Sequence, residues 1–263
     1  MRLLQISDPH LLADPEGLCR GRRPLQQLRH GLQQLLASGP GPVDLLLLSG
    51  DLCHDESWLG YCQLRDLLLQ LGLPMALLPG NHDHPQLLRA ALGRHGAVAP
   101  ALVRCGALDL VVLDSHRAGC EGGELGAAQL RWLQALLAER DGRPLVVALH
   151  HPPLAIGDPF FDGIGLIDGP ALLELLRPVA ALKAVLFGHI HQHWQGLLPG
   201  RGPALFPVLA LGCPSTLRSV AAVQPCPLGR ADDPGARLLT ITPDGGLQQQ
   251  LLRWSPAAAS SLG

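Results

Sequence analysis

The sequence has few charged side chains and no concentration of either sign. Of its 263 residues, 16% are charged, against about 25% in an average domain, and the formal net charge is −2. Because it contains no basic run, it lacks the electrostatic footprint of proteins that follow a nucleic-acid backbone. We therefore expect no nucleic-acid partner, although Arg20, Arg22 and Arg23 keep a nuclease open as an alternative.

Long apolar runs and paired cysteines are missing as well. The longest apolar stretches, such as Ala204–Leu211, are much shorter than the roughly 20 residues of a membrane span. Asp8 interrupts the beginning of the sequence before the apolar region of a signal peptide could form. The seven cysteines are scattered from Cys19 to Cys226 without a C-x-x-C pair, which disfavours disulfides and thiolate zinc sites. These absences favour a soluble cytoplasmic protein without a membrane partner.

Short apolar runs alternate with helical patterns along the chain. Val43–Leu48 has the continuous apolar character of a strand covered on both faces, and Leu25–Leu36 has helical spacing. After His193 the pattern changes to short strands and turns, and 31 glycines with 24 prolines predict many turns throughout. We predict a single α/β domain over residues 1–254 and a flexible C-terminal tail over residues 255–263.

Residue types that bind metals follow five of the predicted strands. These strands are expected at Arg2–Ser7, Val43–Leu48, Pro74–Leu78, Pro144–Leu149 and Lys183–Phe187. The clusters that follow them are Asp8-Pro9-His10, Gly50-Asp51, Gly80-Asn81-His82-Asp83, His150-His151 and Gly188-His189-Ile190-His191. Because the carboxyl ends of strands form the ligand crevice of an open α/β sheet, we expect the five clusters to converge.

The side chains of these clusters suit two divalent cations. Carboxylate, amide and imidazole groups are ligands for hard to borderline ions, and no thiolate is needed. Asp51 is the candidate bridge, because the two oxygens of an aspartate can bind ions about 3.5–4 Å apart. Two such ions with Asp8 and Asp51 leave about two positive charges, which suits an anionic phosphoester. Each cluster alone has a simpler explanation, such as a turn, a helix cap or packed core histidines. Five clusters in order, each at a strand end, favour the metal site.

The five clusters together resemble the calcineurin-like metallophosphoesterases, whose signature is D-x-H, G-D, G-N-H-D/E, H and G-H-x-H. The resemblance implies an α/β fold in which two mixed β-sheets, flanked by helices, form a four-layer αββα sandwich. The metal site is then expected at one edge of the two sheets.

A narrower resemblance, to the bacterial 3',5'-cyclic-AMP phosphodiesterases (class III cyclic nucleotide phosphodiesterases), extends to about residue 253. The matching segments are Gly50-Asp51-Leu52 with Asp55, Leu78-Pro79-Gly80-Asn81-His82-Asp83, Gly123-Glu124-Leu125 with Gln129-Leu130 and Trp132-Leu133, Gly188-His189-Ile190-His191-Gln192, and Cys213-Pro214-Ser215-Thr216. Arg218-Ser219 departs from the pattern, where a glutamine and an aromatic residue are expected. The exact nucleotide is therefore left open.

The resemblance implies a metal-dependent phosphodiesterase that hydrolyses 3',5'-cyclic nucleotides to 5'-nucleotides through a hydroxide bridging two ions. Among these nucleotides, cyclic AMP is the expected substrate. It assigns one ion to Asp8, His10, Asp51 and His191, and the other to Asp51, Asn81, His150 and His189. The identity of the two metals is left open between Fe, Mn, Zn and Mg, which all accept nitrogen and oxygen ligands. His150 is preferred to His151 as a ligand because it comes directly off its strand.

A proton donor is expected because the leaving 3'-alkoxide is strongly basic. His82 is the catalytic candidate, with Asp83 orienting its ring. Further residues are expected behind the ligands or against the substrate: Asp55, Asp114, Ser115, His151, Ser215 and Thr216. His54, His84 and His193 flank the ligands, the loop Gly157–Gly169 is a possible cover of the substrate, and His30, His95 and His116 are expected to face solvent.

Two other functions stay open. One is another phosphodiesterase of the same superfamily, either a glycerophosphodiesterase or a broad-specificity phosphoesterase. The other is a non-catalytic, metal-bound scaffold, which the complete ligand set and His82 disfavour. The sequence leaves the oligomeric state open.

Overall fold

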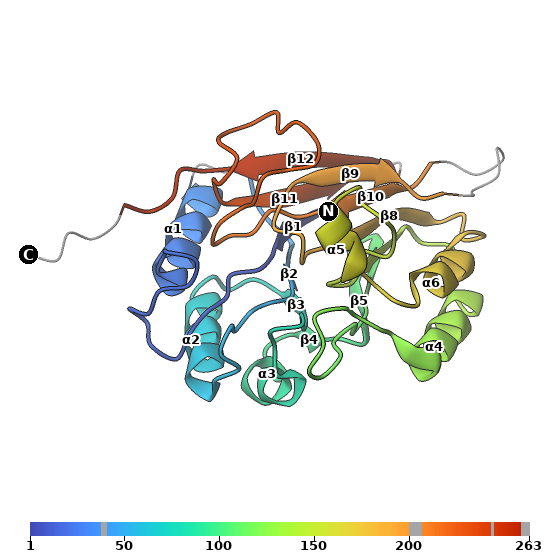
Figure 1. Ribbon diagram of the computed structural model, residues 1–263. Coiled ribbons are helices and arrows are strands. Elements are labelled where there is room, and N and C mark those ends of the chain that lie inside the picture. Colours follow the sequence, from blue (N-terminus) through green and yellow to red (C-terminus); the bar gives the residue numbers. More distant parts are fainter. Residues whose placement is uncertain (38–40, 200–206, 243–244, 259–263) are drawn as a thin grey trace, which may run out of the picture.

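The computed structural model describes residues 1–37, 41–199, 207–242 and 245–258, and its strands form two six-stranded sheets (Figure 1). The first sheet contains, in spatial order, β12 (Leu247–Arg253), β11 (Gly235–Ile241), β1 (Arg2–Ile6), β2 (Leu45–Ser49), β3 (Met75–Leu78) and β4 (Ala97–Val98). The second contains β5 (Ala101–Cys105), β6 (Leu108–Val112), β7 (Leu145–Ala148), β8 (Leu182–Phe187), β10 (Leu209–Gly212) and β9 (Trp194–Leu197). Each sheet has four parallel strands, β1–β4 in one and β6, β7, β8 and β10 in the other.

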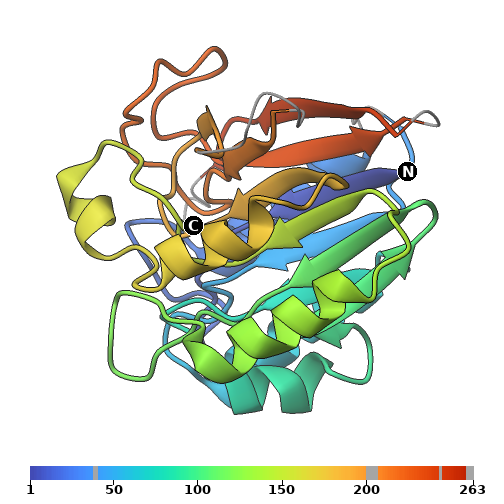
Figure 2. The same cartoon turned by 90° about the vertical axis from the view of Figure 1, so that its right-hand side faces the viewer.

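Helices cover the outer face of each sheet, which gives four layers (Figures 1 and 2). The first sheet packs against α1 (Pro24–Ala37), α2 (Trp58–Leu69) and α3 (Pro85–Leu92). The second packs against α4 (Gly126–Ala138) and α6 (Gly169–Leu176), and the short α5 (Pro159–Gly163) lies in the connection between β7 and α6. The predicted αββα sandwich of two mixed sheets is confirmed.

The continuous apolar runs are explained by burial of both faces of the parallel strands. In β2, Leu45 and Leu47 pack between the two sheets, whereas Leu46 and Leu48 pack under the helices. Successive side chains of a strand point to opposite faces, so a strand covered on both sides has no position for a polar residue. The polar residues therefore gather where these strands end.

The structure also contains elements that the sequence pattern did not reveal, namely β4, β5 and α5. β4 has two residues, and β5 is an edge strand with an exposed Arg104, so neither carries a buried apolar run. One of the short strands expected after His193 is β10, which lies in the apolar stretch Ala204–Leu211 and begins at Leu209; residues 204–206 lie outside the described part of the chain.

At the C-terminal end, residues 255–258 of the predicted tail lie against α1, and residues 259–263 are outside the described part. The Ala257 backbone N–H donates to Gln27 Oε1 at 2.9 Å, and His30 Nε2 lies 3.2 Å from the Ser255 carbonyl oxygen. Among the described residues, none of the helices combines the length and the apolar character needed to cross a bilayer.

Candidate metal centre

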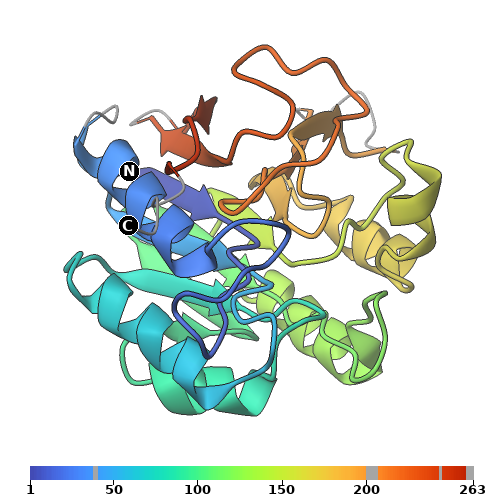
Figure 3. The same cartoon turned by 60° about the vertical axis from the view of Figure 1, so that its left-hand side comes forward.

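The five clusters converge at the carboxyl ends of β1, β2, β3, β7 and β8, where the two sheets meet. Figure 3 shows the loop after β1, in dark blue, beside the orange segment that follows β10. Two hydrogen bonds fix this contact: Thr216 N–H donates to the Ser7 carbonyl oxygen at 2.9 Å, and Ser215 Oγ donates to that of Asp8 at 2.7 Å. The centre is thus assembled from both sheets.

The backbone at the site is held in an unusual conformation. Asp8, His10, Asp51, His189 and His191 all have positive φ angles, between 49° and 68°. Residues other than glycine rarely occupy this region, and such strain is retained at functional sites where the surrounding structure enforces it. Backbone hydrogen bonds do so here, since Asp8 N–H donates to the Gly50 carbonyl oxygen and His10 N–H to that of Asp51, at 3.0 and 2.9 Å.

Two glycines of the predicted motifs allow the loops to approach closely. A Cβ atom on Gly50 would collide with the ring of His150, and one on Gly80 would collide with the carboxylate of Asp51. Any larger residue would push apart two groups that must meet. These motif glycines are therefore required by the spacing of the functional side chains.

One half of the centre consists of Asp8, His10, Asp51 and His191, which are all buried and offer ligand atoms within 4.8 Å of one another. His10 Nε2 lies 3.0 Å from His191 Nε2 and 3.6 Å from Asp51 Oδ2. His191 Nε2 lies 3.4 Å from Asp8 Oδ1. Nitrogen and oxygen ligands about 2.0–2.2 Å from one ion have such mutual separations, so this set fits a single cation.

The other half consists of Asp51, Asn81, His150 and His189. The Asn81 Oδ1 atom lies 3.2 Å from His150 Nε2 and 3.0 Å from His189 Nδ1, and His150 Nε2 lies 3.4 Å from Asp51 Oδ1. Asp51 thus directs Oδ2 to one set of donors and Oδ1 to the other. The His82 backbone N–H donates to the same Oδ1 at 3.0 Å, which ties the third motif to this carboxylate.

Burial and charge determine the protonation of these groups. Burial lowers the pKa of His10 and His189 well below the usual range, which favours the neutral imidazoles that metals require. Burial alone would raise the pKa of Asp51, but the charge and hydrogen bond of His150 hold it well below its usual value. Burial lowers the pKa of His150, but Asp51 outweighs this effect and raises it to about 9. His150 must therefore release a proton when a cation binds.

His151 lies in a group with His150 and His189, with its ring centroid 4.6 Å from that of His189, and both of its ring nitrogens have hydrogen-bond partners in the protein. Its Nε2 lies 3.0 Å from the carbonyl oxygen of Glu121, an acceptor, and its Nδ1 lies 2.8 Å from the hydroxyl of Ser115. The ring therefore donates through Nε2 and accepts at Nδ1. Burial lowers its pKa to about 3, consistent with this neutral form.

Asp83 has a different role from the one predicted. Its carboxylate is completely buried and accepts hydrogen bonds from the backbone N–H groups of Leu52, Cys53 and Gly80 and from the Tyr61 hydroxyl, at 2.8–3.0 Å. The prediction that it orients the His82 ring is therefore wrong: Asp83 joins the loops that follow β2 and β3. Burial, with the nearby charge of Asp51, raises its pKa to about 6.

Several other predicted site residues support the loops. Asp55 accepts from the backbone N–H of Ala13 at 2.8 Å, next to the loop after β1. Ser215 and Thr216 are buried, and their hydroxyls bond to the carbonyl oxygens of Asp8 and Ser7. Ser215 and Thr216 thus support the loop that carries Asp8, whereas Asp55 is exposed and holds the chain at Ala13. Asp114 supports the next loop, because it accepts from the His116 backbone N–H at 2.9 Å.

The histidines outside the ligand set lie in different surroundings, and His30, which was expected to face solvent, is half-buried. His95 is exposed as expected, and His193 is buried away from solvent. His116 was expected to face solvent, but this prediction is wrong: it is half-buried, and its Nδ1 lies 2.9 Å from the Gly80 carbonyl oxygen. His54 lies directly behind a ligand, with its Nδ1 3.2 Å from Nδ1 of His10.

Residues 1–193 match the model of the calcineurin-like phosphoesterases, and the chain belongs to this family. It is 50% identical to the "Probable cyclic nucleotide phosphodiesterase" of Synechococcus sp. (strain WH7803), over 97% of each chain. It is 32% identical to the 3',5'-cyclic adenosine monophosphate phosphodiesterase CpdA of Pseudomonas aeruginosa, over 95% of this chain and 89% of that protein.

Among solved structures, a dimetal phosphatase from Danio rerio has the same fold. It superposes with a TM-score of 0.63 at 15% sequence identity, covering 97% of this chain and 99% of the other. The arrangement of the two sheets and their helices is therefore shared by proteins of very different sequence.

Proposed function

We propose that the protein is a metal-dependent phosphodiesterase that hydrolyses 3',5'-cyclic nucleotides, in particular cyclic AMP, to 5'-nucleotides. The observation that carries this proposal is the placement of Asp51, whose two oxygens face two separate sets of donors. Such an arrangement suits a pair of cations sharing one carboxylate. The two relatives named as cyclic nucleotide phosphodiesterases, at 50% and 32% identity over nearly the whole chain, favour a cyclic nucleotide as the substrate.

The donor atoms fit two resident divalent cations. Asp8 Oδ2 is buried and has no hydrogen-bond partner among the described residues, although buried polar atoms usually have one. We assign Asp8, His10, Asp51 and His191 to one ion, and Asp51, Asn81, His150 and His189 to the other. The donors are oxygen and nitrogen without thiolate, which suits Fe, Mn, Zn or Mg.

Bound cations would supply a water of lowered pKa as the nucleophile and would neutralise charge on the phosphate oxygens. In the overall reaction one water is consumed, the bond between phosphorus and O3' breaks, and the 3'-oxygen receives a proton. We assign the donation of this proton to His82. Its backbone is tied to Asp51, and its ring centroid lies 5.2 Å from that of His10, so the imidazole is held beside the centre.

All seven cysteines are unpaired, which fits a reducing compartment, and we place the protein in the cytoplasm. Its partner there is a small anionic phosphodiester. A glycerophosphodiester or a broad range of diesters is the alternative substrate, and a metal-bound scaffold is the alternative without catalysis.

The proposal is tested by reconstituting the protein with Mn²⁺ or Fe²⁺ and measuring hydrolysis of four substrates in parallel. These are cyclic AMP, cyclic GMP, glycerophosphodiesters and bis-p-nitrophenyl phosphate, with the nucleotide products separated by chromatography. We expect cyclic AMP to give 5'-AMP with the highest kcat/KM among the natural diesters. A higher kcat/KM for glycerophosphodiesters would show that these, and not cyclic nucleotides, are the substrate. Two bound ions without turnover of any diester would support a metal-bound scaffold without catalysis.

A further inference from the structure

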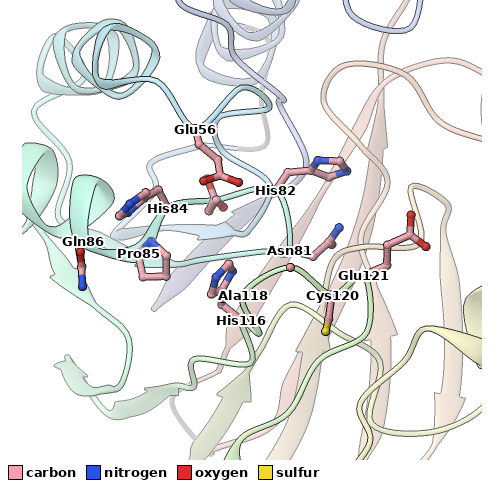
Figure 4. Close-up of a pocket in the computed structure, with 12 residues that line it drawn as sticks. Glu56, Asn81, His82, His84, Pro85, Gln86, His116, Ala118, Cys120 and Glu121 are labelled. Atoms are coloured by element: carbon pink, nitrogen blue, oxygen red, sulfur yellow. The ribbon is translucent and has the colours of Figure 1, made fainter.

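A pocket of about 570 Å³ opens beside Asn81 and His82 (Figure 4), within the range of about 300–1,000 Å³ that small-molecule sites occupy. Its walls come from three segments of the chain. These are Glu56, the stretch Asn81–Gln86 that leads into α3, and the loop between β6 and α4 with His116, Ala118, Gly119, Cys120 and Glu121.

The pocket is fixed relative to the metal centre. The loop on its far side is fastened at two points: His116 Nδ1 lies 2.9 Å from the carbonyl oxygen of Gly80, and the Glu121 carbonyl oxygen lies 3.0 Å from His151 Nε2. Gly80 precedes a ligand candidate, and His151 packs against another, His189. The loop that forms the far wall is therefore attached by hydrogen bonds to the residues that position the ligands.

The charge of the pocket is one-sided. None of its lining residues, all in the described part of the chain, is lysine or arginine. Glu56 and Glu121 are exposed there, and in the view of Figure 4 their carboxylates lie on either side of Asn81 and His82. The nearby Arg117 does not line the pocket, and its guanidinium lies 3.5 Å from Glu124.

A second, smaller pocket of about 310 Å³ has a different character. It is lined by Arg20 and Arg218, together with Asp232. Val220 also lines this pocket, and its backbone N–H donates to the carbonyl oxygen of His191 at 2.9 Å, so the pocket lies beside the other half of the centre. Positive side chains are thus available on that side and absent from the pocket beside His82.

We propose that the pocket beside Asn81 and His82 binds the uncharged nucleoside part of the substrate, and that Glu56 and Glu121 select against a second negative charge on it. This rests on the proposed phosphodiesterase activity. In a cyclic diester the 3'-oxygen stays attached to the ribose, so the sugar must lie on the side of the proton donor. The pocket next to His82 is on that side. A cyclic mononucleotide has a single charge on its phosphate, whereas a further phosphate or carboxylate would meet two carboxylates and neither lysine nor arginine.

The test uses a matched pair of substrates, 2'-O-butyryl and 2'-O-succinyl cyclic AMP, which are similar in size but differ by one carboxylate. The E56Q/E121Q variant should raise kcat/KM for the succinyl ester relative to the butyryl ester by about fivefold at low salt, since exposed charges act through solvent. The gain should shrink at 0.5 M NaCl. Glu174→Gln, on the distant α6, is the control that keeps the wild-type ratio.

A steric variant tests the location independently of charge. Ala118→Trp should raise KM for cyclic AMP at least tenfold while the content of bound Mn²⁺ stays at the wild-type level. An unchanged ratio in E56Q/E121Q, or an unchanged KM in Ala118→Trp, overturns the assignment of the pocket while cyclic AMP is still hydrolysed. Absence of cyclic AMP hydrolysis by the metal-loaded wild-type protein overturns this assignment and the proposed function together.

Discussion

Replacing Asp51 by asparagine removes one negative charge and one carboxylate oxygen from the middle of the centre. Oδ2 of this residue faces His10 and Oδ1 faces His150, at 3.6 and 3.4 Å, so each donor set loses a ligand in one substitution. The asparagine keeps the size of the side chain and a carbonyl oxygen that can accept from the His82 backbone. Any loss of cations therefore reports charge and ligation rather than packing.

The expected loss is large for both cations. Residues that only support a ligand cost about 10–100-fold in metal affinity when they are replaced, and a shared ligand should cost at least the upper value. A 100-fold loss corresponds to about 2.7 kcal/mol for each ion. Diesterase activity should fall with the cation content.

The assay is reconstitution with Mn²⁺, desalting, and counting of bound ions by plasma mass spectrometry, with affinities from competition against a chelator. His191→Asn is the matched comparison, because this residue faces one donor set only. We expect two ions in the wild-type protein, fewer than one in Asp51→Asn and about one in His191→Asn. Two ions held at wild-type affinity by Asp51→Asn would refute the shared carboxylate, provided that circular dichroism shows the variant to be folded.

Three further predictions concern the neighbouring histidines. His82→Ala should keep both ions but lower turnover of cyclic AMP by about 10²–10⁴-fold, and slow p-nitrophenyl diesters much less, because nitrophenolate needs no proton. His54→Phe should weaken the ion held by His10 by about 10–100-fold, since it removes the partner of the His10 Nδ1 atom. In metal-free protein, Asp51 raises the pKa of His150 to about 9 from about 6.5 in the unfolded chain. This pair should contribute about 3 kcal/mol to the free energy of unfolding below pH 6.5, a contribution that is lost as the pH rises through 9.

Each of these predictions has an outcome that contradicts it. Equal slowing of the two substrate classes by His82→Ala excludes the proton donor. If competition titrations give His54→Phe the same metal affinities as the wild-type protein, the contact between His54 and His10 does not support the centre. His95→Phe, at an exposed position, is the control. A free energy of unfolding in urea that stays constant between pH 6.5 and 9 in metal-free protein excludes the ion pair.

The sequence predicted those elements best whose burial allows only one arrangement of apolar and polar residues. Strands such as β2 are buried on both faces, so their apolar runs and the polar residues at their ends are visible along the chain. β5 is an edge strand with mixed burial, and α5 has five residues, so neither leaves a periodic signal.

Contacts between distant segments explain the errors at the site. Asp83 was predicted to act on the adjacent His82, but Tyr61 and the backbone after β2 take up its carboxylate. The position of His116 against the Gly80 carbonyl depends on how the second sheet packs on the first. Neither contact can be inferred from spacing along the chain. The preference for His150 over His151, by contrast, followed from the strand end alone and is supported by the occupied nitrogens of His151.

The proposed activity requires that seven side chains, dispersed along the sequence, form a cage around two cations that share Asp51. Crystals of the protein loaded with Mn²⁺, measured at the manganese absorption edge, test it directly. We expect two anomalous peaks, about 3.5–4 Å apart, on either side of the Asp51 carboxylate. A single peak, or peaks away from Asp51, would contradict it.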